Sequence, residues 1–170
     1  LARAHGRIPT RGHGGWATYT AFVDTPVLAL RAELYIELGD SYASRLECER
    51  AASAYMKAAE LSAENLTQKQ QLSISERLVN VQKLGPAITN LQAIRRAEPE
   101  NSNARLMLAR YLGWHNQPRQ SAIVADELMT LQPDNLDAKI IKATVSSWRG
   151  DHDTAIPLFE EVLRKQEDFD

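Results

Sequence analysis

The sequence predicts an all-α protein made of consecutive antiparallel helix pairs, and three observations support this fold class. Apolar residues recur at intervals of three and four, which is the period of an α-helix. Turn-forming residues interrupt this pattern regularly. The sequence also matches itself when it is shifted by 34 residues, the separation of Trp114 and Trp148. A repeat of this length is typical of a solenoid, in which each unit buries its apolar face against the next.

The repeat is clearest in the second half of the chain. Identical residues related by the shift are Pro99 and Pro133, Asn101 and Asn135, Ala104 and Ala138, Ala109 and Ala143, and Trp114 and Trp148. Small residues form one series over three units, Ala87, Ser121 and Ala155, and apolar residues form another, Ile94, Leu128 and Val162. We expect the small residues where the second helix of a unit approaches the first most closely, because a larger side chain would force the helices apart.

An earlier unit fits the same template with a slip of two residues. It reads Tyr35, Leu38, Gly39 and Tyr42, and then Ala51, Tyr55 and Ala58. This pattern resembles the tetratricopeptide repeat (TPR), whose consensus places a large apolar residue, Leu-Gly/Ala and an aromatic in one helix, and Ala, aromatic, Ala in the next. The resemblance covers residues 32–170 and implies a right-handed superhelix of about four repeats. Arg105 and Lys139 depart from it, because they occupy the first large apolar position.

The units are expected at residues 32–67, 68–101, 102–135 and 136–170, preceded by a glycine-rich segment. Residues 1–31 are interpreted as a loop or the remnant of an earlier repeat, and the whole chain as a fragment of a larger protein. Thr67 and Gln70 have the spacing of a capping box. Proline near a helix start, at Pro86 and Pro118, is compatible with helix because its missing N–H has no partner there anyway. Asp153 is expected to cap the last helix.

Composition excludes several functional classes. The net charge of −2 gives no basic excess of the kind that binds nucleic acid. Charge is unevenly distributed, since residues 1–31 are mainly basic and residues 149–170 mainly acidic; solvated faces explain this most simply. No apolar stretch approaches a membrane span. The single Cys48 allows no internal disulfide and is expected in the core.

No pattern of catalytic or metal-binding residues is present. The four histidines are far apart and lack ligand spacing with one another or with Cys48. Nucleotide-binding glycine motifs and a serine nucleophile motif are absent from the sequence. We therefore expect a protein without catalytic residues, metal or cofactor.

A binding surface is the remaining prediction. In TPR proteins the first helices of successive repeats line a concave groove, and the resemblance carries its positions onto this chain. The groove candidates are Glu33, Ile36, Asp40, Lys69, Leu72, Glu76, Asn80, Asn103, Leu106, Arg110, Trp114, Asp137, Ile140, Thr144 and Trp148. Because these positions mix acidic and basic residues, a clamp for a peptide carboxylate, as in chaperone adaptors of the family, is not expected.

Two interpretations of Trp114 and Trp148 remain open. Each indole could seal the turn against the following repeat, with most of its area buried, which is the interpretation favoured by the sequence. Alternatively, the indoles could be exposed and contact a partner protein or a sugar ring, since a flat apolar face gives contact at little entropy cost.

Residues 100–170 have a narrower resemblance, based on the end of the first helix at Trp148 and the following "DHDTAIPLFEEVL". They are similar to repeats in the periplasmic part of Gram-negative outer-membrane exopolysaccharide exporters of the cellulose, poly-N-acetylglucosamine and Pel types. This resemblance implies a periplasmic scaffold that recruits a polysaccharide-modifying enzyme and guides polymer to a pore. The alternative is a general adaptor, cytoplasmic or periplasmic, that binds a peptide or helix of a partner protein.

Overall fold

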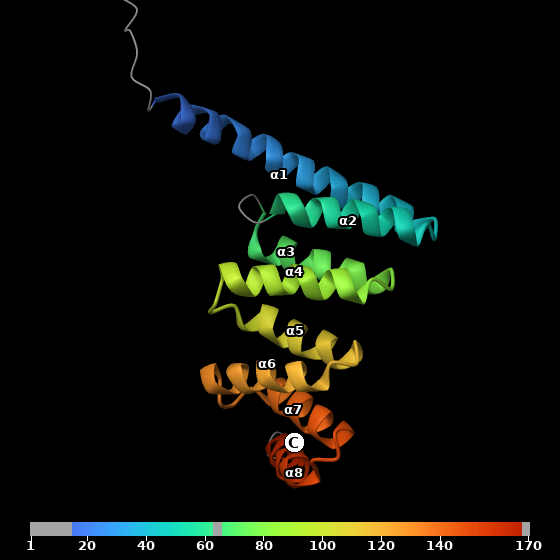
Figure 1. Ribbon diagram of the computed structural model, residues 1–170, viewed down its shortest axis with the longest axis vertical. Coiled ribbons are helices and arrows are strands. Elements are labelled where there is room, and N and C mark those ends of the chain that lie inside the picture. The colour runs from blue at the N-terminus through green and yellow to red at the C-terminus, as the bar shows by residue number, and fades with distance from the viewer. Residues whose placement is uncertain (1–14, 63–65, 168–170) are drawn as a thin grey trace, which may run out of the picture.

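The computed structural model describes residues 15–62 and 66–167, and this part of the chain is helical throughout (Figure 1). Its helices are α1 (Gly15–Ser44), α2 (Cys48–Ser62), α3 (Gln68–Asn80), α4 (Leu84–Ala97), α5 (Ser102–Trp114), α6 (Pro118–Leu131), α7 (Leu136–Trp148) and α8 (His152–Glu167). Consecutive helices pack as pairs, and the pairs stack along the long axis of the molecule. The predicted fold class, a right-handed solenoid of antiparallel helix pairs, is confirmed.

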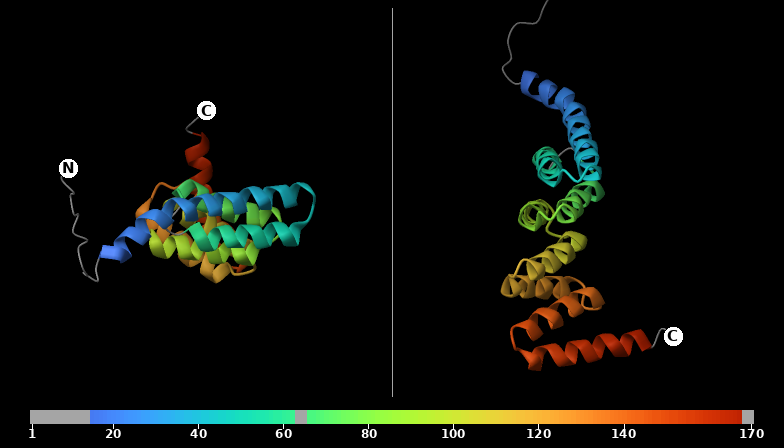
Figure 2. Two further views of the ribbon diagram at one scale, coloured as in Figure 1. Left: turned by 90° about the horizontal axis from the view of Figure 1, so that it is seen from above. Right: turned by 90° about the vertical axis from the view of Figure 1, so that its right-hand side faces the viewer.

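The helices form two layers. Figure 2 shows α1 and α3 on one side of the stack and α2 and α4 on the other. Each second helix also packs against the first helix of the next pair, through the α2–α3, α4–α5 and α6–α7 junctions. In addition, α5 contacts α7 directly, so neighbouring first helices form a continuous wall in this region.

Side-chain caps fix where the first helices begin. Thr67 and Gln70 form the predicted capping box at the start of α3. Asn101 and Asn135, which are one repeat apart, each accept a hydrogen bond of 2.9 Å from the backbone N–H three residues later. These side chains satisfy amide groups that a helix start otherwise leaves without partners.

The second helices begin differently. Pro118 is the first residue of α6, as its missing N–H permits. At the start of α8 the prediction was wrong by two residues. Asp151, rather than Asp153, accepts the capping hydrogen bond from the Thr154 amide at 3.2 Å, because the helix begins at His152 and Asp153 already lies in its first turn.

The turn inside every pair has the same backbone conformation. Leu46, Gln82, Asn116 and Gly150 all have positive φ angles, of 61°, 62°, 57° and 77°. The next residue in each turn donates its N–H to a carbonyl five residues earlier, as Gln117 does to Leu112 at 2.9 Å. This arrangement satisfies the last carbonyls of the first helix and reverses the chain direction.

Small residues lie between the helices of each pair, as predicted. Ala51, Ala87 and Ser121 are fully buried, and Ala155 is 2% exposed. Ser121 additionally donates a hydrogen bond of 2.6 Å from its hydroxyl to the Ala109 carbonyl. The close approach of two backbones therefore leaves room for one hydroxyl but not for a longer side chain.

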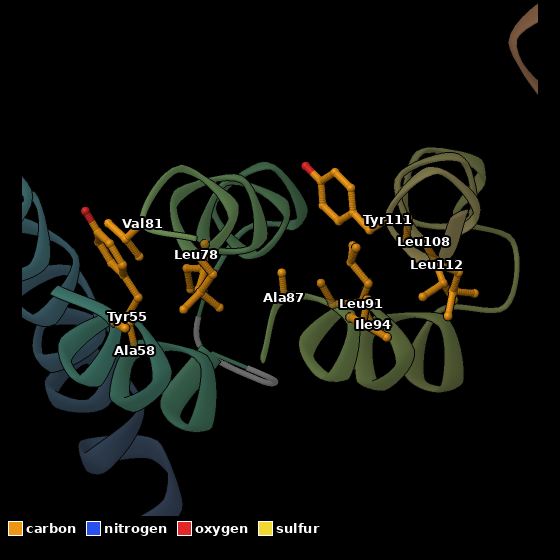
Figure 3. Packing of buried hydrophobic residues seen from close by; sticks show 14 of the residues in the cluster. Tyr55, Ala58, Leu78, Val81, Ala87, Leu91, Ile94, Leu108, Tyr111 and Leu112 are labelled. Atoms are coloured by element: carbon orange, nitrogen blue, oxygen red, sulfur yellow. The ribbon is translucent and has the colours of Figure 1, made fainter. Parts of the chain in front are cut away.

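One apolar core runs through successive pairs from α1 to α7. Figure 3 shows part of it, with Leu91 and Ile94 of α4 beside Leu108 and Leu112 of α5. Because each unit contributes apolar side chains to the junction with the next, no pair buries its apolar face alone.

The two residues that depart from the TPR pattern are buried ions with nearby acids. Arg105 is 9% exposed and Lys139 is 6% exposed. Arg105 lies 3.7 Å from Glu127, and Lys139 lies 2.5 Å from Glu161. The two pairs are related by the 34-residue shift, but they are not equivalent, because Lys139 donates a hydrogen bond to Glu161 whereas Glu127 accepts its hydrogen bond from Arg95 rather than from Arg105. A buried cation requires such a partner.

The N-terminal region differs from expectation. Helix α1 begins at Gly15 and continues without a break to Ser44. Of the two interpretations of residues 1–31, a loop or the remnant of an earlier repeat, the loop does not hold for residues 15–31, and residues 1–14 lie outside the described residues. Cys48 is exposed at the start of α2 rather than buried. It precedes the apolar face of that helix, which starts with Ala51 and Ala52.

Candidate functional site

The predicted groove residues differ in exposure, and one of them lies in the core. Nine are exposed, namely Glu33, Lys69, Glu76, Asn80, Asn103, Trp114, Asp137, Ile140 and Trp148, and five are partly buried, namely Asp40, Leu72, Leu106, Arg110 and Thr144. Ile36 is only 7% exposed and belongs to the apolar core with Ala32, one turn earlier on α1. Its assignment to an exposed wall was therefore wrong.

The two tryptophans line one hollow of about 150 Å³ between α5 and α7. Its lining consists of Ala109, Arg110, Gly113 and Trp114 from α5, Ser121 from α6, and Ile140, Ile141, Thr144, Val145 and Trp148 from α7. Trp114 is 58% exposed and Trp148 is 60% exposed. The favoured interpretation, in which each indole seals a turn and is mostly buried, is thus wrong.

Each indole is held from one side. The Trp114 ring stacks on Tyr111, one turn earlier in α5, with centroids 5.4 Å apart and planes inclined by 30°. The Trp148 ring extends over Gly113, since a Cβ at that glycine would lie only 3.5 Å from its Cζ3 atom. These contacts fix the indoles while more than half of each remains free to touch another molecule.

Polar groups surround the hollow. Arg110 lies 3.7 Å from Asp137, across the α5–α7 junction. Burial raises the pKa of Tyr111, and the negative charge of Glu76 on α3 raises it further. Within the hollow, apolar and aromatic side chains lie beside the Arg110 side chain, so the hollow can accept a ligand with an apolar group next to a polar one.

The α1–α3 part of the wall is occupied by internal bonds. Arg77 donates two hydrogen bonds to the Asp40 carboxylate, at 2.8 and 3.1 Å, and the Tyr55 hydroxyl donates a third at 2.7 Å. Gln70 donates one of 3.0 Å to Glu33. Asp40 thus joins α1, α2 and α3, and its main role is to fix their packing.

These hydrogen bonds shift the pKa values of Asp40 and Tyr55. Burial raises the pKa of Asp40, but the hydrogen bonds from Arg77 and Tyr55 and the Arg77 charge outweigh it, so the net shift is downward. The pKa of Tyr55 is raised by burial and by Asp40. Arg77 and Tyr55 were missed at the sequence level, since the TPR pattern marks Tyr55 only as a packing residue.

A larger hollow of about 720 Å³ lies at the second helices, between α2 and α4, and reaches the turn at His115 and Gln117. Its walls mix Met56 and Ile88 with Glu60 and Thr89. It contains neither tryptophan, and none of the predicted groove residues lines it.

Among the described residues we find neither a metal-binding cluster nor a membrane-spanning helix. No three His, Cys, Asp or Glu side chains among them come together in a way that could hold a metal ion. None of the described helices combines the length and the apolar character needed to cross a bilayer. The exposed aromatic hollow is therefore the candidate site.

Fold and site together define a helical-repeat solenoid with an exposed aromatic surface on its first helices. No family model matches the chain, and no curated protein matches it. Solved structures do. A crystal structure of MamA aligns over 89% of this chain and 85% of its own, with a TM-score of 0.64 and 15% identity.

Two further structures show the same similarity. MamA from Desulfovibrio magneticus RS-1 aligns over 82% of this chain and 77% of its own, with a TM-score of 0.64 and 18% identity. YrrB, a TPR protein with an unusual peptide-binding site, aligns over 81% of this chain and 70% of its own, with a TM-score of 0.64 and 16% identity. The chain therefore has the fold of a TPR-like solenoid.

Proposed function

We propose that this protein is a non-catalytic scaffold that binds a segment of a partner protein on its first helices, with Trp114 and Trp148 as anchors. The proposal rests on the exposure of two indoles, 58% and 60%, that line the same hollow. Tryptophan is among the residues that contribute most binding energy at protein interfaces.

The arrangement favours binding because the tryptophan side chains lose little conformational freedom when a partner binds. Tyr111 and Gly113 already hold the two rings in place, so fewer rotamers are lost when a partner binds. The hollow can take one apolar side chain, and Arg110 in its lining can donate hydrogen bonds to polar groups of the partner. A helix or an extended peptide with one apolar anchor fits this description. The fold shared with YrrB, itself a TPR protein with a peptide-binding site, supports the same class of ligand.

A second candidate function is narrower. The protein would be the periplasmic scaffold of an exopolysaccharide export machine, which recruits a polysaccharide-modifying enzyme and guides polymer toward an outer-membrane pore. Two things support it: the resemblance of residues 100–170 to such repeats, and the exposed indole faces, which suit stacking on sugar rings. The location proposed with it is the periplasm. An adaptor of the first kind could equally be cytoplasmic.

One titration discriminates the two candidates. Tryptophan fluorescence is followed while the protein is mixed with peptides selected from a displayed library and, separately, with oligomers of glucose and of N-acetylglucosamine. Saturable binding of peptides alone supports the adaptor, and binding of oligosaccharides supports the export scaffold. Absence of both, with a folded protein, contradicts the proposed site.

A further inference from the structure

A hollow of about 430 Å³ lies at the junction of α4 and α5, and its lining is cationic. Three of its five lining residues are arginines: Arg95 and Arg96 come from the last turn of α4, and Arg105 comes from α5. Gln92 and Pro99 complete the lining, which includes no acidic residue of the described chain. We call this the arginine hollow. It shares no residue with the hollow of the two tryptophans.

Arg105 is buried and yet incompletely paired. It is 9% exposed, and its Nε and Nη1 atoms donate no hydrogen bond to any of the described residues. Its acidic partner, Glu127, lies 3.7 Å from Nε and already accepts a hydrogen bond of 2.6 Å from Arg95. Because a buried guanidinium with unused donors is unfavourable, Arg105 favours the entry of a further negative group into the hollow.

Two more acids lie close to the hollow along the chain. Glu98 ends α4, and its Oε2 atom accepts hydrogen bonds from Gln68 and Asn101, at 2.6 and 2.9 Å. Glu100 is exposed, so solvent and salt screen its charge. Both acids lower the attraction for an anion, but neither lines the hollow. The donors of the lining arginines therefore stay available to a ligand.

The packing of the repeat does not require this cluster. One repeat later, Met129 and Thr130 replace the two arginines of α4. The buried cation of that repeat, Lys139, donates a hydrogen bond to Glu161 and so has its own partner. The dipole of α4 favours basic residues in its last turn, but it does not explain a third arginine that reaches the same hollow from α5.

We propose that the arginine hollow binds a phosphate group as its dianion. Guanidinium groups hold phosphate oxygens through paired, charge-assisted hydrogen bonds. The three arginines are opposed at contact distance by the single carboxylate of Glu127, which leaves two positive charges. A phosphate group on a side chain carries about −1.5 to −2 at neutral pH and matches this excess. Free inorganic phosphate and a phosphorylated partner both offer this group.

Binding is measured by NMR on the 170-residue chain, from the Nε–H signals of its arginine side chains at constant ionic strength. The titrants are inorganic phosphate, a short phosphoserine peptide, and the same peptide without phosphate. We expect saturable shifts in the signals of Arg95, Arg96 and Arg105 with the first two titrants only. Tighter binding of the phosphopeptide identifies a phosphorylated partner as the source, and equal binding identifies the free ion.

The charge of the ligand is tested through pH. The second pKa of a phosphate group is about 6, so phosphate should bind more weakly at about pH 5.5 than at about pH 7.5. Sulfate keeps two negative charges over this range and should bind equally at both values, which controls for changes in the protein. Phosphate binding that does not weaken at the lower pH would contradict a site for the dianion.

Substitutions locate the site. Arg105→Met should lower phosphate affinity at least about tenfold, because it removes the charge and donors of a buried guanidinium. Arg96→Gln, at an exposed position that should not affect folding, should lower it about two- to fivefold. Glu127→Gln should raise it, since the competing carboxylate is lost. Arg119→Gln removes the same charge from an exposed position outside the hollow and is the matched control. Circular dichroism checks that each variant is folded.

Two results would overturn the proposal. One is a dissociation constant above about 10 mM for both inorganic phosphate and the phosphopeptide, which is weaker than a specific site provides. The other is equal phosphate affinity in Arg96→Gln, Arg119→Gln and the unaltered chain, which would show that the anion binds outside the arginine hollow.

Discussion

Gly39 of α1 lies against the phenol ring of Tyr55 of α2, so closely that a Cβ at this position would overlap the ring. Gly113 of α5 differs, because a Cβ there would lie 3.4 Å from its nearest neighbour, Val145, which is ordinary contact. The two glycines are thus present for different reasons. Only Gly39 is required by the packing of its helix pair.

This difference predicts opposite effects for the same substitution. Gly39→Ala should destabilise the protein by about 1–3 kcal/mol, since the Tyr55 ring must move and overpacking outweighs the gain in helix propensity. Gly113→Ala should stabilise it by about 0.5–1 kcal/mol, because alanine restricts the unfolded chain and fits the site. Urea unfolding of both variants measures the two values. A Gly39→Ala variant as stable as the unaltered chain would contradict the packing described for α1 and α2, and a destabilised Gly113→Ala variant would contradict the fit described at Val145.

The bonds around Asp40 predict a dependence of stability on pH. Its pKa in the folded state lies below the ordinary value of 3.8. The stabilisation is therefore present above that value and is lost as the pH falls through the lower folded pKa. Asp40→Asn should be less stable than the unaltered chain at pH 7, and the difference should shrink below about pH 4. A difference independent of pH would show that the carboxylate charge is not involved. Urea unfolding at a series of pH values provides the measurement.

The repeated turn predicts another pair of opposite effects. Leu46 is 85% exposed and has a φ of 61°, a conformation that costs a β-carbon-bearing residue about 1 kcal/mol. Leu46→Gly should therefore raise stability by up to about 1 kcal/mol, and Gly150→Ala, with a φ of 77°, should lower it by a similar amount. Thermal melts of the two variants test this. If Leu46→Gly is destabilising, the leucine side chain makes a contact that its exposure does not indicate.

Enlarging a small residue between two helices should lower the stability of the protein, whereas removing a partly exposed charge should change it little. Ala155→Leu should destabilise by about 1–3 kcal/mol, because Ala155 is 2% exposed between α7 and α8. Arg110→Ala should change stability by less than about 1 kcal/mol, since its ion pair with Asp137 is partly solvated. Comparable losses in a thermal melt would mean that the 34-residue register is misassigned.

Much of the fold follows from the sequence because local signals and the repeat agree. The capping box at Thr67, the proline at position 118 and the small residues from Ala51 to Ala155 each indicate the same helix boundaries or the same close contacts. A repeat multiplies such signals, so that a weak unit can be aligned with a clear one. The family resemblance also implied the correct class of superhelix.

The errors arose where exposure depends on distant parts of the chain. Ile36 lies in the core one turn after Ala32, whereas the groove positions carried over from the TPR pattern had placed it on the exposed wall. Trp114 and Trp148 are at the ends of their helices, where periodicity does not determine which way a ring turns. Their exposure follows from Tyr111 and Gly113, which hold the rings at the surface. The network at Asp40 joins three helices and likewise needs the tertiary structure.

Binding of a partner segment by the two indoles can be measured with variants that lack one ring. A peptide selected on the unaltered protein is titrated by calorimetry into Trp114→Ala, Trp148→Ala and the control Ile123→Ala, which lies on α6 away from the hollow. We predict that each tryptophan variant loses at least about tenfold in affinity, or about 1.4 kcal/mol, with an unchanged melting temperature. Unchanged affinity in both tryptophan variants would place the binding site elsewhere and contradict the account.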